Sequence, residues 1–137
     1  MAKAKILIAE DDLPLLELYD KKFTKSGYEV VRAEDGGVAV EKAKSENPDI
    51  ILLDVMMPVM NGFEVLKKVK NMPECESTPV VILSNYGEMP NITEGLMDGA
   101  VEYLIKVEHT PEEVVEVVAD ALKERESLIG KAFKETK

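Results

Sequence analysis

Five short apolar runs, each followed by polar residues, constrain the fold of this chain more than any other feature. Their hydrophobicity is continuous rather than alternating, which is typical of strands covered on both faces. Strands of that kind belong to parallel sheets, so the pattern predicts a parallel β-sheet. The runs cover residues 6–9, 28–31, 50–53, 80–83 and 101–105.

Amphipathic stretches of helical period separate these runs. Thr110, Pro111 and the acids Glu112 and Glu113 give the last helix a strong start signal. Five strand–helix pairs joined by short connections favour an α/β fold: a doubly wound five-stranded parallel sheet with helices on both faces. We expect the helices over residues 13–26, 37–46, 61–70, 90–98 and from 110 onward.

The composition limits the partners and the compartment that the chain can have. Its 137 residues suit one domain. Asp and Glu total 27 against 17 Lys and Arg, and the net charge of -10 should repel nucleic acid and anionic membranes. A single cysteine, Cys75, fits a reducing compartment. We find no apolar run long enough for a membrane span or a signal-peptide core. We therefore expect a cytoplasmic domain that binds neither nucleic acid nor membrane directly.

Five polar residues stand where the expected strands end. Glu10 and Asp11 follow the first run, Asp54 follows the third, and Ser84 and Lys106 follow the last two. Ligands of open parallel sheets bind at the carboxyl ends of the strands. The pattern therefore brings three carboxylates, a hydroxyl and an ammonium group to one edge of the sheet.

This combination favours phosphoryl chemistry. Three carboxylates within a few ångströms repel one another unless they take up protons or share a cation. An oxygen-rich cluster open to water suits Mg²⁺, which also takes phosphate as a ligand. Asp54 could then attack phosphorus, while Lys106 and Ser84 stabilise the phosphoryl oxygens. Taken singly, each residue also has an ordinary structural explanation: Asp54 could cap a turn, and the acids at 10–12 could cap a helix.

The segment DVMMPVMNG at residues 54–62 resembles the phosphorylation loop of response-regulator receiver domains of the CheY-like type. The resemblance covers residues 4–124 and leaves residues 125–137 as a short C-terminal extension with no output domain. It implies a flavodoxin-like sheet of strand order 2-1-3-4-5. Residues that match at the family's spacing are Glu10, Asp11, Ser84, Tyr103 and Lys106.

The resemblance also implies a role for each residue of the acidic group. Asp54 would accept a phosphoryl group from the phosphohistidine of a sensor histidine kinase or of a phosphotransfer protein. Asp11 and Asp54 would bind Mg²⁺ directly, together with the backbone carbonyl of Met56. Glu10 would reach the ion through water.

A second set of implied roles concerns signalling. Lys106 and Ser84 would contact the phosphoryl group. Movement of Ser84 would draw Tyr103 inward and change the surface that a downstream protein target reads. The chain would then be a phospho-accepting switch in two-component phosphorelay signalling, and not an enzyme beyond its own phosphorylation and dephosphorylation.

Two departures from the family pattern carry expectations of their own. Val107 replaces the usual proline after Lys106, so we expect a trans bond and a displaced loop, because a cis non-proline bond costs about 2.5–4 kcal/mol. Met56 and Tyr86 occupy positions that in the family tune hydrolysis, and neither offers a carboxylate or amide to orient water. This indicates a long-lived phosphoryl form.

Two other classes of function remain open from the sequence. An aspartyl-phosphate phosphatase of small molecules would want a second acid two residues after Asp54, where Met56 stands. A flavodoxin-like cofactor carrier would need a phosphate-binding loop at the position of Glu10 and Asp11. Residues 125–137 could support a weak homodimer, or they could be a frayed end of a monomer.

Overall fold

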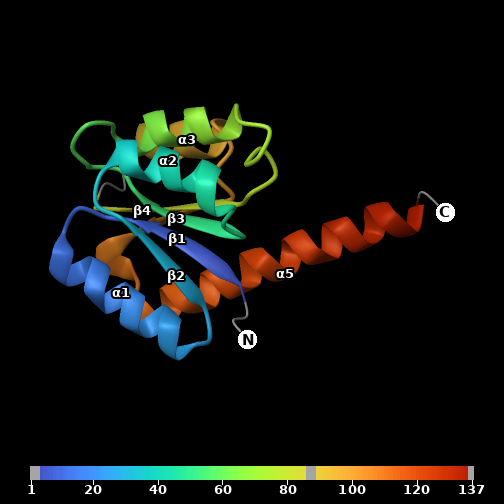
Figure 1. The fold of residues 1–137 in the computed structure, drawn as a ribbon, viewed down its shortest axis with the longest axis horizontal. Coiled ribbons are helices and arrows are strands. Elements are labelled where there is room, and N and C mark those ends of the chain that lie inside the picture. Colours follow the sequence, from blue (N-terminus) through green and yellow to red (C-terminus); the bar gives the residue numbers. More distant parts are fainter. Residues whose placement is uncertain (1–3, 86–88, 136–137) are drawn as a thin grey trace.

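The computed structural model describes the backbone of residues 4–85 and 89–135 and the side chains of residues 4–85 and 92–125. Strands and helices alternate along the chain as expected (Figure 1). The elements are β1 (Lys5–Ala9), α1 (Leu13–Lys25), β2 (Glu29–Ala33), α2 (Gly36–Glu46), β3 (Ile50–Asp54), α3 (Gly62–Lys70), β4 (Val80–Ser84), α4 (Met89–Met97), β5 (Glu102–Ile105), the 3₁₀ turn η1 (Lys106–Glu108) and α5 (Pro111–Glu135).

The five strands form one parallel sheet in the order β2-β1-β3-β4-β5, which confirms the predicted order. Helices cover both faces: α1 and α5 pack together on one face, and α2, α3 and α4 line the other (Figure 1). Every residue of β3 and β4 is buried. The continuous apolar runs therefore belong to strands covered on both sides, as the sequence predicted.

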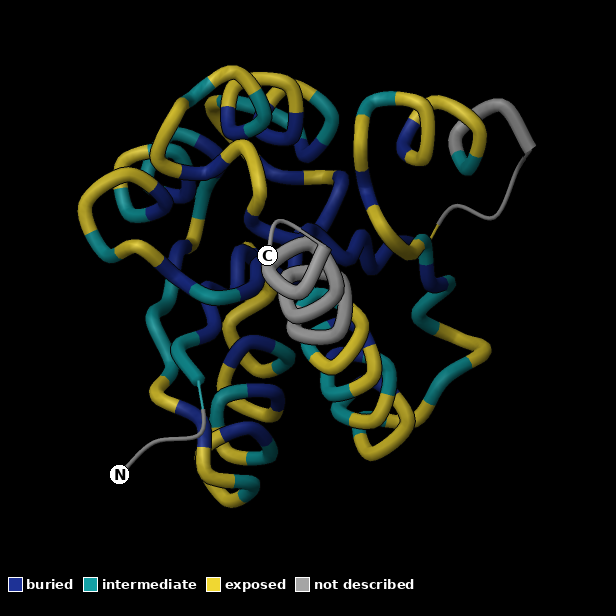
Figure 2. The backbone as a smooth tube through the Cα atoms, turned by 90° about the vertical axis from the view of Figure 1, so that its right-hand side faces the viewer, coloured by how far each residue is buried: buried dark blue, intermediate teal, exposed yellow. Residues whose placement is uncertain are grey.

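Successive residues of each central strand point to opposite faces, so the sheet separates two cores. In β3, Ile51 and Leu53 face the α2–α3 side, while Ile50 and Leu52 face the α1–α5 side. Buried segments accordingly gather in the strands and on the inner faces of the helices (Figure 2). This two-sided packing fixes the strand ends, where the expected site lies.

Helix starts follow the capping rules that the sequence suggested. Asp12, the third of the acids at 10–12, accepts a hydrogen bond from the Leu15 amide at 3.3 Å and therefore caps α1. At α5, Thr110 and Glu113 exchange hydrogen bonds between side chain and backbone, at 3.0 and 3.2 Å. No helix among the described residues is both long and apolar enough to cross a membrane.

Two edge strands differ from their predicted bounds. β5 begins at Glu102 rather than Val101, whose amide donates to Val80 but whose side chain is 47% exposed. β2 extends to Ala33 and includes the charged Arg32, because an edge strand is less buried and accepts polar residues. Hydrophobicity alone therefore locates central strands better than edge strands.

The loop from β3 to α3 packs against the start of α2. A Cβ atom added to Gly36 would overlap the Met60 carbonyl, whereas one added to Gly37 would lie 3.3 Å from its nearest neighbours, the side chains of Asp35 and Val59. The Gly36 amide also donates to the Pro58 carbonyl at 3.3 Å. Gly36 is thus needed for this close approach, and Gly37 is not.

Val59 lies at the tip of the same loop with φ of 72°. The amide of Met60 donates to the carbonyl of Pro58 at 2.8 Å, which closes a γ-turn around Val59. A β-branched residue is strained in this region of φ. The loop that follows Asp54 therefore stores strain at a side chain that is 82% exposed.

We predict that Gly36→Ala lowers the free energy of unfolding by about 2 kcal/mol, because a backbone carbonyl must move to admit the methyl group. Gly37→Ala is the matched control in the same helix turn and should change stability by less than about 1 kcal/mol. Urea unfolding of both variants measures the difference. Equal stabilities would contradict the packing described for Gly36.

We predict that Val59→Asn raises the free energy of unfolding by about 1 kcal/mol, because asparagine tolerates positive φ. Val107→Asn is the control, since Val107 is 87% exposed and does not have positive φ. Its effect should stay within about 0.5 kcal/mol. If thermal unfolding shows that Val59→Asn does not stabilise the protein relative to this control, the strain at Val59 is absent.

Candidate functional site

The polar residues predicted at strand ends do meet at the carboxyl edge of the sheet. Glu10 and Asp11 come directly after β1, and Asp54 is the last residue of β3, the strand that pairs with β1. Ser84 is the last residue of β4, and Lys106 directly follows β5. Adjacent parallel strands thus hold these groups without help from long loops.

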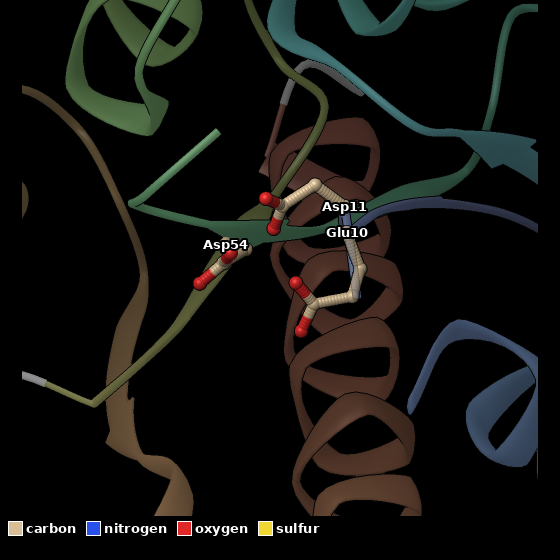
Figure 3. A group of neighbouring side chains, drawn as sticks. All are labelled: Glu10, Asp11 and Asp54. Atoms are coloured by element: carbon tan, nitrogen blue, oxygen red, sulfur yellow. The ribbon is translucent and has the colours of Figure 1, made fainter. Parts of the chain in front are cut away.

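Three carboxyl groups converge at this edge (Figure 3). One oxygen from each of Glu10, Asp11 and Asp54 lies within 4.8 Å of the other two. Glu10 and Asp54 are only 3% and 6% exposed, whereas Asp11 is open to solvent. The cluster therefore has a buried side against the sheet and an open side toward water.

Lys106 is the cation of this cluster. Its Nζ donates to Glu10 Oε1 at 2.6 Å and lies 3.2 Å from Asp54 Oδ1. Burial alone would lower the pKa of Lys106, but the hydrogen bond to Glu10 and the charge of Asp54 outweigh it and raise that pKa. The ammonium group is therefore charged at neutral pH.

The Lys106–Val107 peptide bond is trans, as expected, since every described peptide bond is trans. Val107 lies in the turn η1 with its side chain 87% exposed. The expected displacement of this loop does not keep Lys106 away from the carboxylates. Valine in place of proline is thus compatible with contact between Lys106 and Asp54.

The surroundings of Glu10 disfavour its negative charge. Burial raises the pKa of Glu10 to about 8, and the neighbouring Asp54 carboxyl adds to the rise, while Lys106 opposes it. One Glu10 oxygen binds Lys106, but the other, Oε2, is buried and has no hydrogen-bond partner among the described residues. A single ammonium group therefore does not satisfy the three carboxyl groups.

The donor set fits a divalent cation. Three carboxylates against one lysine leave an excess of negative charge, and all three ligands are hard oxygen atoms. A cation between them would remove the repulsion that now raises the pKa of Glu10. Glu10, Asp11 and Asp54 are the residues that could hold it.

The remaining predicted residues are Ser84, Tyr103, Met56 and Tyr86. Ser84 is buried at the end of β4, where its backbone register places it opposite Ile105. Tyr103 is half-buried on β5 and packs against the α2–α3 core. Met56 exposes 59% of its surface. Tyr86 lies outside the described residues.

The structure adds two residues that the sequence analysis did not assign to the site. The Gly62 amide donates to the Val55 carbonyl at 2.8 Å. A Cβ atom added to Gly62 would overlap the Asp54 carbonyl. Tyr19, on α1, lines a small cavity together with Glu10 and Asp54. The tyrosine hydroxyl, on a helix face whose other buried members are apolar, is the sequence feature that could have indicated a place near the site.

The arrangement matches a known family. The family model described as "Response regulator receiver domain" matches residues 6–119. The response regulator PleD of Caulobacter vibrioides is 41% identical over 103 residues, which are 75% of this chain but 23% of PleD. Sporulation initiation phosphotransferase F of Bacillus subtilis is 36% identical over 106 residues, 77% of this chain and 84% of that protein.

Solved structures agree with these relatives. The receiver domain of the Francisella response regulator 1452 superposes with a TM-score of 0.82 at 32% identity, over 89% of this chain and 98% of that one. The chain spans about a quarter of PleD and most of the other two proteins. From its sequence match, fold and strand-end residues, the chain belongs to the response-regulator receiver family of two-component phosphorelay signalling.

Proposed function

We propose that Asp54 is the phospho-acceptor of this receiver domain. The observation that carries the proposal is the convergence of Glu10, Asp11 and Asp54 within 4.8 Å, with the Lys106 ammonium 3.2 Å from Asp54. Asp54 lies at the end of a fully buried strand, so its position is fixed. Phosphoryl transfer depends mostly on such positioning and on neutralised charge.

In the proposed reaction, an Asp54 carboxylate oxygen forms a bond to the phosphorus of a phosphohistidine. The bond from phosphorus to the histidine nitrogen breaks, and the electron pair stays with that nitrogen. The donor is a sensor histidine kinase or a phosphotransfer protein. The Lys106 ammonium, already in contact with Asp54, neutralises charge on the transferred group.

The proposed metal is Mg²⁺, held by Asp11, Asp54 and the Met56 backbone carbonyl, with Glu10 bound through water. The exposed Asp11 and buried Asp54 offer hard oxygen ligands from two adjacent strands. When bound, Mg²⁺ supplies positive charge for the phosphoryl oxygens and orients them.

Ser84 and Tyr103 form the proposed switch. Ser84 is buried at the carboxyl end of β4, beside the strand that carries Tyr103. A hydrogen bond from the Ser84 hydroxyl to the phosphoryl group would pull β4 and its neighbour toward the site. Tyr103 would follow, and the altered α4–β5–α5 surface would bind a downstream protein target.

Family membership does not favour the two rival functions. The position of a second catalytic acid in a small-molecule phosphatase holds Met56, whose side chain faces solvent. The loop after β1 carries Glu10 and Asp11, which would repel the phosphate of a flavodoxin-like cofactor. We infer that the chain acts on its own Asp54 and not as an enzyme on other substrates.

We also propose that residues 4–124 form the receiver and that residues 125–137 form a short extension of it. The helix α5 continues through this boundary to Glu135 and extends beyond the sheet (Figure 1). A monomer or weak homodimer in the cytoplasm is the expected state.

We predict that acetyl phosphate with Mg²⁺ adds about one phosphoryl group per molecule, because the acetyl phosphate anion can replace the phosphohistidine donor. Asp54→Asn should abolish the adduct, since the nucleophile is lost, and Asp11→Asn should reduce its rate of formation by about 100-fold. Intact-mass spectrometry measures the adduct.

Asp12→Asn is the matched control for this experiment. Asp12 is also acidic and exposed, but its side chain caps α1. It should phosphorylate at the wild-type rate. A lasting adduct in Asp54→Asn would overturn the assignment of Asp54, and equal rates in the Asp11 and Asp12 variants would overturn that of Asp11.

We predict that the phosphoryl group on Asp54 persists well beyond minutes in Mg²⁺ buffer without partners. The Met56 thioether, exposed to solvent near the acceptor, cannot orient a water for attack. Met56→Asn supplies an amide that can, and should shorten the lifetime by about tenfold. Decay of the wild-type adduct within minutes, followed by intact mass, would contradict this prediction.

A further inference from the structure

A small cavity lies beneath the carboxylate cluster, on its buried side. Its volume is about 10 Å³, close to the least space that holds one water molecule. Its polar lining residues are Glu10, Asp54 and Tyr19, and aliphatic side chains of β1, β3 and β4 complete its wall. The cavity therefore has the size and the polar partners that an ordered water requires.

Glu10 has an oxygen that such a water would satisfy. Its Oε1 accepts a hydrogen bond from Lys106, but its Oε2 is buried and finds no partner in the part of the chain that the structure describes. Buried polar atoms in folded proteins nearly always have a hydrogen-bond donor or acceptor beside them. Because Glu10 is one of the residues that line the cavity, a water there could supply a donor to this oxygen.

Tyr19 also lines the cavity and carries a neutral donor. It projects from α1 and is 3% exposed. Burial raises the pKa of Tyr19, and its side chain shares the cavity with Glu10 and Asp54. A tyrosine hydroxyl in this position can donate toward the carboxylates.

We propose that Tyr19 is a positioning residue of the metal site, acting on Glu10 through one ordered water in this cavity. The Tyr19 hydroxyl donates to the water, and the water donates one proton to Glu10 Oε2 and directs the other toward Asp54. Glu10, held by Lys106 on one oxygen and by this water on the other, keeps the orientation needed to bind the solvent shell of the metal. The inference rests on the proposed function, because it deepens the same site.

Tyr28 provides a matched control. It is also buried, packs in the same α1–α5 core, and contacts Phe23 edge-on with ring centroids 5.2 Å apart. Burial raises the pKa of Tyr28. Tyr19→Phe and Tyr28→Phe therefore remove the same hydroxyl group from one core, near the carboxylates and far from them respectively.

The test is a Mg²⁺ titration of the full chain, followed by backbone amide shifts in NMR spectra. Groups that support metal ligands typically contribute 10–100-fold in affinity. We expect Tyr19→Phe to weaken Mg²⁺ binding by about tenfold and Tyr28→Phe by less than about twofold. In a Glu10→Gln background, Tyr19→Phe should cause no further loss, because it acts through Glu10.

The outcomes separate this inference from the function on which it rests. If the wild-type chain binds no Mg²⁺, the proposed function and this inference both fail. If the wild type binds Mg²⁺ but Tyr19→Phe matches Tyr28→Phe, or still loses tenfold in the Glu10→Gln background, the inference alone fails. A crystal structure of the wild type should show one water within hydrogen-bond distance of Tyr19 and Glu10 Oε2, and a dry cavity would also overturn it.

Discussion

Repulsion among three carboxyl groups is the constraint on which the rest of this structure depends. Glu10, Asp11 and Asp54 are held within 4.8 Å by two adjacent strands, and Lys106 is the ammonium group that contacts two of them. Burial is the main cause of the raised pKa of Glu10, and the neighbouring Asp54 carboxyl adds to the rise. The cluster persists because β1 and the fully buried β3 pair directly and hold their carboxyl ends side by side.

The loops around the site show the same compromise between stability and position. Val59 takes a strained backbone conformation, and Gly36 and Gly62 leave room for backbone atoms at close range. Each feature brings the segment after Asp54 close to the sheet edge. Strain of this kind persists only where surrounding packing fixes it, and here the contacts of the loop with the start of α2 supply that packing.

Much of this could be predicted from the sequence, because the physical signals were local. Apolar runs that end in acidic residues predict β1 and β3 together with the carboxylates at their ends. Because the same runs are continuously hydrophobic, they also predict that these strands are buried on both faces. Edge strands were less predictable, since Val101 and Arg32 sit where burial is partial.

The contacts between elements could not be predicted in the same way. The reach of Lys106 depends on the course of η1, which the replacement of proline by Val107 made uncertain. The place of Tyr19 depends on how α1 packs, because an apolar stripe does not reveal which of its members faces a polar cavity. Sequence patterns fix which face is buried, and tertiary packing decides what each buried group meets.

The most direct test of this account is to locate the cation. Mn²⁺ prefers the same hard oxygen ligands as Mg²⁺ and broadens the NMR signals of nearby amides. The account predicts that substoichiometric Mn²⁺ first removes the amide signals of residues at the carboxyl ends of β1 and β3, around Asp11 and Asp54. Broadening that begins elsewhere, or none at this edge of the sheet, would contradict it.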